Sequence, residues 1–340
     1  MTLEAPDPVP APESLPNEPA ATDRLAEGSA IAVAERGSIA GRAKTTRVVS
    51  SDVTVTDRLR EVWRSRQLLR NMVRTEIKVK YKNSFLGMVW SLLSPAMAIG
   101  VYVVVFGLIL KNGVPDFVIL LFSGLLAWNL FLNGVLAATG VIVNNAALVK
   151  KVSFPREILA LGAVGSAGVF FFFQGCVMVI LLVALHSAPA WGELWLLPVA
   201  FVPLVVFTTA LAVFLAAVNV YLRDTQHLVE VVVGAAWFWA CPIVYSFQTQ
   251  AAHRLGTHGL TWLYMLNPLT PIVMTFQRVL YARQFALSTI APHSRTQYLP
   301  SWGAGTYVWL DVGVLAGSLV LFYLAMVVFG RLAGNFAEEL

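Results

Sequence analysis

The chain has 340 residues, of which 57% are hydrophobic and 13% are charged, with a formal net charge of +5. A soluble domain typically has about 45–50% apolar and about 25% charged residues. The composition therefore excludes a disordered protein and argues against a soluble globular enzyme. Two cysteines, Cys176 and Cys241, are too few for a disulfide framework or a four-thiolate metal site. Because both lie in apolar runs, we expect small buried side chains.

The first 55 residues differ in composition from the rest of the chain. Prolines are frequent among the first twenty residues, with Glu, Ala and Asp between them, and no periodic apolar pattern begins before about residue 58. Such a segment buries too little apolar surface to offset the entropy of ordering it. It also lacks the basic start and apolar block of a secretory signal. We predict a disordered Pro-rich tail over residues 1–55.

Residues 56–83 combine basic side chains with an apolar stripe at helical spacing, but the stripe is too short to cross a bilayer. A basic amphipathic helix with an aromatic anchor, here Trp63, lies in the plane of the lipid headgroups. Its arginines can reach lipid phosphates. Arg66 and Arg70 interrupt the stripe. The alternative is therefore two short helices that meet near Ser65, each with its own apolar face.

Six later segments are long enough to cross a membrane, which takes about 20 apolar residues. They lie at about residues 86–110, 117–143, 157–185, 195–222, 228–247 and 307–331. Interior prolines such as Pro95, Pro203 and Pro242 predict kinks or broken helix ends. The sequence therefore predicts an all-α integral membrane protein with six transmembrane helices.

Basic residues near the span ends predict the orientation, because they are retained on the cytoplasmic side. One side carries Arg58, Arg60, Arg64, Arg66, Arg70, Arg74, Lys78, Lys80, Lys82, Lys150, Lys151, Arg156, Arg223 and Arg331. The other side carries Lys111, Arg254, Arg278, Arg283 and Arg295, spread over much longer loops. We predict that both termini are cytoplasmic.

Two loops and one longer segment between the spans have compositions that predict a specific role. The cytoplasmic loop 144–156 contains apolar residues, which on a short loop are typical of a partner surface, although a solvated turn is the alternative. Arg223-Asp224 follows span four directly and fits a local ion pair or a helix cap. The outward segment 248–306 is interrupted by Asn267-Pro268 and is too short to cross. We expect it to enter the outer leaflet part-way and return, with its backbone covered by protein or water.

Aromatic residues are dense in spans one and five. The two clusters are Trp90, Tyr102 and Phe106 in the first, and Trp237, Phe238, Trp239, Tyr245 and Phe247 in the fifth. Most aromatic residues in membrane proteins form interface belts or pack against lipid. Aromatic faces also stack on the C–H surfaces of sugars, so a sugar path is the alternative.

The middle of every predicted span lacks Asp, Glu, Lys and Arg. Ion-coupled transporters usually carry such groups there, which argues against a secondary transporter. The histidines are scattered, and no HExxH, Asp-x-Asp or nucleophile motif occurs, so catalysis by this chain and a resident metal or cofactor are not expected. The outward segment 248–306 lacks acidic residues and faces the wrong side for a glycosyltransferase that uses nucleotide sugars. A membrane transport protein that lacks its own energy source implies a partner protein that supplies the energy.

Six motifs follow one another along the chain. The lead into span one reads Arg74-Thr-Glu-Ile-Lys78-Val-Lys80-Tyr81-Lys-Asn-Ser84-Phe-Leu-Gly87, and span two contains Gly124-Leu-Leu-Ala-Trp128. The next loop reads Leu148-Val-Lys150-Lys151-Val-Ser-Phe154-Pro155-Arg156. Arg223-Asp224, Pro242-Ile-Val-Tyr245 and Asn267-Pro268 with Arg278 come after it. Over residues 56–335 this series resembles ABC-2 type permeases, the membrane subunits of exporters for O-antigen, teichoic acid and other polyprenyl-linked polysaccharides.

The resemblance implies a homodimer of plasma-membrane permeases, each bound to a separate ABC ATPase that holds ATP and Mg²⁺. A channel would form mainly from spans one and five of the transmembrane domain 84–335. The gate helix within 56–83 would hold the lipid pyrophosphate through Arg66, Arg70, Arg74, Lys78, Lys80, Tyr81, Ser84 and Gly87. The ATPase would dock on Asn145, Leu148, Lys150, Lys151, Phe154, Pro155, Arg156, Arg223 and Asp224.

The cargo implied by the resemblance is a polyprenyl-pyrophosphate-linked polysaccharide. High Ala, Gly and Val usage together with the Pro-rich tail suggests an actinobacterial member and cell-wall galactan as the glycan. A drug or a simple lipid is the alternative cargo. The expected partners are a second copy of the chain, two ATPase subunits, the glycan and membrane lipids, but no nucleic acid.

Overall fold

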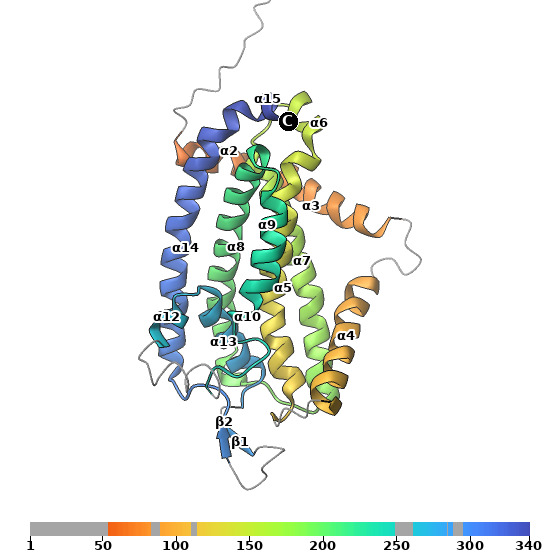
Figure 1. Cartoon of the computed structure of the whole chain (residues 1–340), viewed down its shortest axis with the longest axis vertical. Helices are drawn as coiled ribbons and strands as arrows, with labels where there is room; N and C mark the ends of the chain where they lie inside the picture. Colours follow the sequence, from red (N-terminus) through yellow and green to blue (C-terminus); the bar gives the residue numbers. More distant parts are fainter. Residues whose placement is uncertain (1–53, 83–88, 110–113, 249–260, 284, 288–294) are drawn as a thin grey trace, which may run out of the picture. The chain divides into compact units, whose positions relative to one another are not determined.

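The computed structural model describes residues 54–82, 89–109, 114–248, 261–283, 285–287 and 295–340 (Figure 1). The predicted tail, residues 1–55, lies outside the described residues up to position 53, and the first helix already begins at Val55. Two predicted gate residues, Ser84 and Gly87, also lie outside the described residues.

Among the residues that the structure describes, four long helices are apolar enough to cross a membrane, with a mean hydropathy between 1.9 and 2.5. They are α5 (Phe117–Asn144), α7 (Glu157–Ala184), α8 (Leu196–Tyr221) and α14 (Ala304–Leu332). They match predicted spans two, three, four and six to within a few residues at each end. In the bundle, α5 packs against α7 and α8, and α8 also packs against α14 (Figure 1).

The segment predicted as span one is a helix of two kinds. The α-helix α4 (Trp90–Tyr102) contains Pro95 and continues as the π-helix η2 (Val103–Ile109). A proline removes one N–H donor and clashes with the turn before it, so Pro95 perturbs the start of α4 and does not account for the π-helix that begins at Val103. Helix α4 packs mainly against α7.

The segment predicted as span five is also interrupted and ends earlier than expected. It consists of α9 (Thr225–Val231), the π-helix η4 (Val232–Ala236) and α10 (Trp237–Trp239). The prediction extended this span to residue 247, but the helix ends at Trp239. Pro242 follows closely, and a proline disfavours helical geometry at the residue before it.

The basic segment forms two helices, α2 (Val55–Arg64) and α3 (Arg66–Tyr81), which meet at Ser65. Thr54 caps the first helix by accepting a hydrogen bond from the Asp57 N–H, and the chain leaves helical geometry at Ser65, where φ is −91° and ψ is 18°. Of the two interpretations of this segment, the pair of short helices is therefore confirmed.

The remaining elements lie at the two ends of the bundle. One end, which we call the basic end, is where α5, α8 and α14 finish and α7 begins. It also carries α6 (Ala146–Lys151), η6 (Ala333–Asn335) and α15 (Phe336–Glu339). The other, the hairpin end, carries η3 (Trp191–Glu193), α12 (Thr261–Met265), α13 (Leu269–Leu280) and the strands β1 (Phe285–Leu287) and β2 (Arg295–Gln297).

The two short strands pair antiparallel, with Phe285 opposite Gln297. This hairpin is the one departure from the all-α expectation in the part of the chain that the structure describes. Helix α13 has 12 residues, all of them buried, so it is shorter than a spanning helix and is covered by protein on every side.

Candidate functional site

A row of cations runs along α3. Arg66, Arg70, Arg74 and Lys78 follow one another at intervals of four residues, and all four are exposed. Residues four apart share one face of a helix. Within the described ranges, no carboxylate forms an ion pair with any of the four. We call these four residues the cation stripe.

Two charged residues of α3 lie on its other face, toward α7. The Lys80 ammonium is 4.0 Å from the ring centroid of Phe170, and burial lowers the pKa of Lys80. Burial raises the pKa of the Glu76 carboxyl, against the opposing effect of a hydrogen bond with the Ser166 side chain. Tyr81 is the last residue of α3. The predicted phosphate-binding set therefore divides into the cation stripe and Lys80, which is also exposed but whose ammonium lies over Phe170 of α7.

Helix α3 approaches α7 closely because α7 offers glycines there. A Cβ atom at Gly165 would lie only 2.9 Å from Cγ2 of Val73. At Gly162 it would lie 3.5 Å from the Cβ of Met72. Small residues allow two helix backbones to approach in a membrane protein. The apolar face of α3 is thus seated on the first half of α7 (Figure 1).

Helix α2 is held by a buried ion pair. Arg58 Nη1 lies 2.9 Å from Glu157 Oε1, and the two side chains are 12% and 4% exposed. Arg58 Nη2 also donates to the carbonyl of Gly330 at 3.4 Å. One guanidinium thus joins α2 to the start of α7 and the end of α14. The sequence pattern did not reveal this pair, because its partners are far apart in the chain.

The predicted coupling segment forms the short helix α6 at the basic end. Asn145 separates α5 from α6 and donates from Nδ2 to the carbonyl of Val141 at 2.8 Å. Val149 is buried and anchors the helix, whereas Leu148 and both lysines, Lys150 and Lys151, are exposed. An apolar side chain flanked by cations is therefore open to a partner here.

The residues that follow α6 lead back into the bundle. Phe154 and Pro155 are half-buried. Arg156 Nη1 donates to the carbonyl of Ala333, and the guanidinium lies 5.6 Å from the ring centroid of Phe336. Burial lowers the pKa of Arg156, and the neighbouring Glu157 opposes this effect. The fully buried Phe336 of α15 thus supports the coupling segment from behind, a contact that the sequence did not predict.

Arg223 and Asp224 are both exposed at the basic end. In this described stretch the two side chains form no ion pair, and Asp224 makes no side-chain capping bond to α9. The turn is instead closed by buried Asn219, whose Oδ1 accepts from the N–H of Gln226 at 3.2 Å. The expected ion pair is therefore wrong in this stretch, and Asp224 is the N-cap residue of α9 without a side-chain bond, so both side chains remain available for other contacts.

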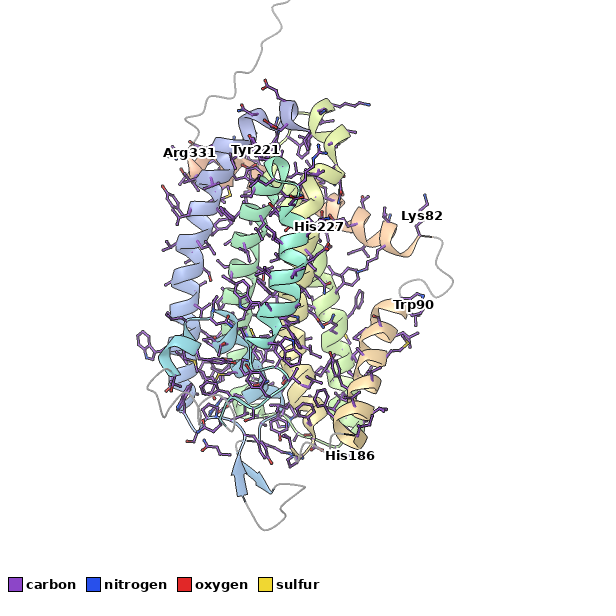
Figure 2. All side chains as sticks on the ribbon, in the orientation of Figure 1. Lys82, Trp90, His186, Tyr221, His227 and Arg331 are labelled. Carbon is purple, nitrogen blue, oxygen red and sulfur yellow. The ribbon has the colours of Figure 1, made fainter. Side chains whose placement is uncertain are left out.

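Of the eight predicted channel aromatics, two are widely exposed. Trp90 at the start of α4 is 41% exposed, and Trp239 at the end of α10 is 63% exposed. Figure 2 shows Trp90 on the same side of the bundle as Lys82, which follows α3. Both tryptophans thus offer ring faces outside the core.

The other predicted aromatics take part in packing. Tyr102, Phe106 and Phe117 form a chain of rings, and the Phe238 ring lies 5.4 Å from Trp128. Trp237 donates from Nε1 to Asn267 Oδ1 at 2.9 Å. Tyr245 is half-buried and donates to the Trp239 carbonyl at 2.9 Å, and Phe247 is 1% exposed. This placement favours a core role for Phe247.

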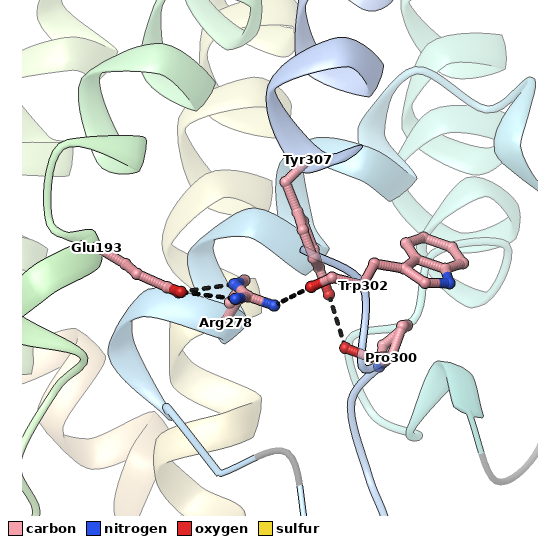
Figure 3. Close-up of polar contacts among 5 residues, drawn as sticks. All are labelled: Glu193, Arg278, Pro300, Trp302 and Tyr307. Carbon is pink, nitrogen blue, oxygen red and sulfur yellow. Dashed lines mark hydrogen bonds and ion pairs between the residues drawn. The ribbon is translucent and has the colours of Figure 1, made fainter. Parts of the chain in front are cut away.

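A second ion pair, between buried Arg278 and half-buried Glu193, lies at the hairpin end (Figure 3). Arg278 donates from Nε and Nη2 to the two carboxylate oxygens of Glu193, each at 2.6 Å, and from Nη1 to the Trp302 carbonyl at 2.6 Å. Its guanidinium lies 4.8 Å from the Tyr307 ring centroid. The hydrogen bonds with Glu193 raise the pKa of Arg278. The pair fixes the buried helix α13 to the short helix η3.

No group of three or more His, Cys, Asp or Glu side chains that could hold a metal ion occurs in the parts of the chain described above. The arrangement at the basic end consists of exposed cations and apolar groups and has no evident nucleophile beside a general base.

The family model described as ABC-2 type transporter matches residues 67–281. The O-antigen export system permease protein RfbA of Myxococcus xanthus is 32% identical over 226 residues, which are 66% of this chain and 84% of that protein. A protein of the same name from Klebsiella pneumoniae is 26% identical over 210 residues, 62% of this chain and 78% of the relative. With its long apolar helices, the chain is a multi-pass protein of the inner membrane, and it belongs to the ABC-2 type transporter family.

Proposed function

We propose that this chain is the six-span permease of an ABC exporter that moves a polyprenyl-pyrophosphate-linked polysaccharide from the cytoplasm across the plasma membrane. ATP would be hydrolysed in a separate ATPase subunit, two copies of which bind a homodimer of the chain. Spans one and five would be α4–η2 and α9–η4–α10, and the basic end would face the cytoplasm. The similarity to proteins named as O-antigen export permeases supports this class of cargo.

The cation stripe is the observation that carries the proposal. A pyrophosphate presents two adjacent negative groups, and cations four residues apart on a helix are separated by a rise of about 6 Å. Each basic side chain near an anionic surface contributes on the order of 1 kcal/mol. Four exposed cations without acidic partners can therefore hold the headgroup at the inner leaflet, with Lys80 next to them on the α7 side.

The coupling segment offers a route by which the ATPase could move this helix. The ATPase would dock on the exposed face of α6 around Leu148. Arg156 is the last residue of that segment, and its neighbour Glu157 forms the buried pair with Arg58 of α2. These contacts form a continuous chain from α6 to the two basic helices. A displacement of α6 would therefore reach the cation stripe without crossing the core of the bundle.

The glycan is proposed to be cell-wall galactan, on the grounds of the Ala-, Gly- and Val-rich composition and the Pro-rich start of the chain. Exposed Trp90 and Trp239 suit sugar chains, because stacking of sugars on rings is weak, repeated and indifferent to register. A polymer can slide past such faces without being trapped.

The test is reversal of charge in the stripe. Arg70→Glu combined with Arg74→Glu should abolish export and cause the undelivered lipid-linked glycan to accumulate inside cells depleted of the native chain. Assembly with the ATPase should persist, because within the described ranges neither side chain forms an ion pair or hydrogen bond with another element. Arg60→Glu, exposed on α2, is the control and should retain export. Normal export by the double variant would overturn the phosphate role, and the chemical identity of the accumulated lipid would reveal the cargo.

A further inference from the structure

Three amide side chains lie close to the middle of the bundle, at a depth where a polar group in contact with lipid costs free energy. Asn129 and Asn133 are on α5, and Gln174 is on α7. Helix α5 spans Phe117–Asn144, so at 1.5 Å per residue Asn133 lies about 4 Å from its midpoint. The hydrocarbon core of a bilayer is about 30 Å thick, which puts this depth well inside it. Even so, Asn133 is exposed on the surface of the chain.

The three amides are only partly satisfied by one another. Asn129 Nδ2 donates to Gln174 Oε1 at 3.1 Å, and Asn133 Nδ2 donates to the Asn129 carbonyl at 2.7 Å. Within the described residues, the Asn133 side-chain oxygen has no donor. Facing lipid, that oxygen would carry the full cost of an unpaired polar group in hydrocarbon. This face of α5 must therefore meet something other than lipid.

The neighbours of the amides show which part of the surface this is. Gln174 brings the strip to the edge of α7, against which α4 packs. On the other edge, a Cβ atom at Gly234 of η4 would lie 3.8 Å from the Leu132 side chain. The open strip of α5, which includes exposed Ala137, thus lies between α7 and η4. The proposed channel walls, spans one and five, both contact α5, through η2 and α9.

The opposite side of α7 has a different character at the same depth. Phe172 is 64% exposed, and its ring lies 6.2 Å from Phe201 of α8. Cys176 is one helical turn further on and is also exposed. This side has the composition of a surface that faces lipid chains. One exposed face at mid-depth is thus polar and the other apolar.

We propose that the strip of α5 marked by Asn129, Asn133 and Gln174 lines a water-filled path and donates and accepts hydrogen bonds with the hydroxyl groups of the passing glycan. The inference rests on the proposed export function and extends the path beyond spans one and five. Neutral amides suit this position, because they exchange hydrogen bonds between water and sugar hydroxyls without the strong attraction of a charge. The polymer is kept hydrated at the midplane and is not held there.

Thiol accessibility tests the path directly. Asn133→Cys is made in a chain with Cys176→Ala and Cys241→Ala, in membranes containing the ATPase partner, and is treated with a small charged methanethiosulfonate. The comparison is the Cys241→Ala chain, in which Cys176 remains. A thiol reacts as the thiolate, which forms only where water reaches it. We expect the thiol at position 133 to react at least tenfold faster than Cys176.

Two results would overturn the inference. Equal and slow reaction at both positions would mean that the strip faces lipid. Protection of position 133 together with spontaneous cross-linking of two copies would mean that the strip is an interface between subunits.

The contact with cargo has its own test. Asn133→Leu should reduce export several-fold without changing assembly with the ATPase. Asn133→Gln keeps the amide and should retain export, and Phe172→Leu should leave export unchanged. Full export by Asn133→Leu would refute the hydrogen-bonding role. Accessibility reports the path whatever the cargo is. If the chain does not export a glycan, depleting it will leave glycan export intact. The thiol at position 133 would still react, so the path would stand although the proposed cargo is wrong.

Discussion

Arg58 of α2 and Glu157 at the start of α7 are paired at 2.9 Å in a site where both side chains are almost fully covered. Taking two charges out of water is costly, and the attraction within the pair mainly offsets that cost. The pair therefore fixes the position of α2 more than it adds to stability. Removing one partner is expected to be far more harmful than removing both.

The first prediction follows from this asymmetry. Arg58→Met leaves the Glu157 carboxylate buried without a partner and should destabilise the protein by about 3–5 kcal/mol. Adding Glu157→Leu to Arg58→Met should recover most of that loss, because no buried charge remains. Thermal unfolding in detergent, followed by tryptophan fluorescence, measures both changes. If the double variant is as unstable as the single one, the ion pair itself stabilises the folded protein beyond offsetting the cost of burying its two charges.

The second prediction concerns the contact between α3 and α7. Gly165→Ala places a Cβ atom 2.9 Å from Val73 and should loosen α3, whereas Gly168→Ala meets nothing within 4 Å. Alanine is favoured over glycine inside a helix by about 1 kcal/mol, so the control should be neutral or stabilising. Limited proteolysis at the basic helices distinguishes the two. Equal protection in both variants would mean that α3 is not seated on this surface.

The third prediction is a pH dependence set by Glu76. Burial raises the pKa of this carboxyl in the folded protein. The folded state therefore binds the proton more tightly than the unfolded state, and stability should fall as the pH rises from the ordinary carboxyl pKa through the raised one. Glu76→Gln should remove this fall and leave the protein more stable at pH 8. Glu61→Gln, exposed on α2, is the control and should keep the pH dependence of the parent in the same unfolding assay.

The fourth prediction concerns the surface of α6. Leu148 is 38% exposed, so Leu148→Asp should leave thermal stability unchanged while reducing ATPase binding about tenfold, or about 1.4 kcal/mol. Ser301→Asp adds the same charge at the exposed hairpin end and should bind the ATPase normally. Co-purification at matched expression is the measurement. Equal recovery of the ATPase with both variants would exclude α6 as the docking surface.

The sequence predicts the long helices well because apolar length reports a spanning helix directly. It indicates the four members of the cation stripe as candidate phosphate-binding residues, but it places Arg66 and Arg70 on the apolar side of the helix and so does not show the separate cationic face. It could not predict that Trp237 and Phe247 pack inward, because composition does not distinguish a core ring from an exposed one. The pairs Arg58–Glu157 and Arg278–Glu193 were equally hidden, since each joins residues from distant parts of the chain.

The helices η2 and η4 have a consequence for how the two sides of the α5 strip can move. A π-helix holds an extra residue in its turn, and π segments occur frequently at functional sites. When a π-helical turn shifts by one residue along a helix, the side chain at that position rotates by about 100° around the helix axis. The backbone hydrogen bonds on either side of the turn are kept. The helices that contain η2 and η4 can thus rotate in small steps of low energetic cost. Each step would turn one set of side chains away from the proposed glycan path and another set toward it, without unfolding either helix.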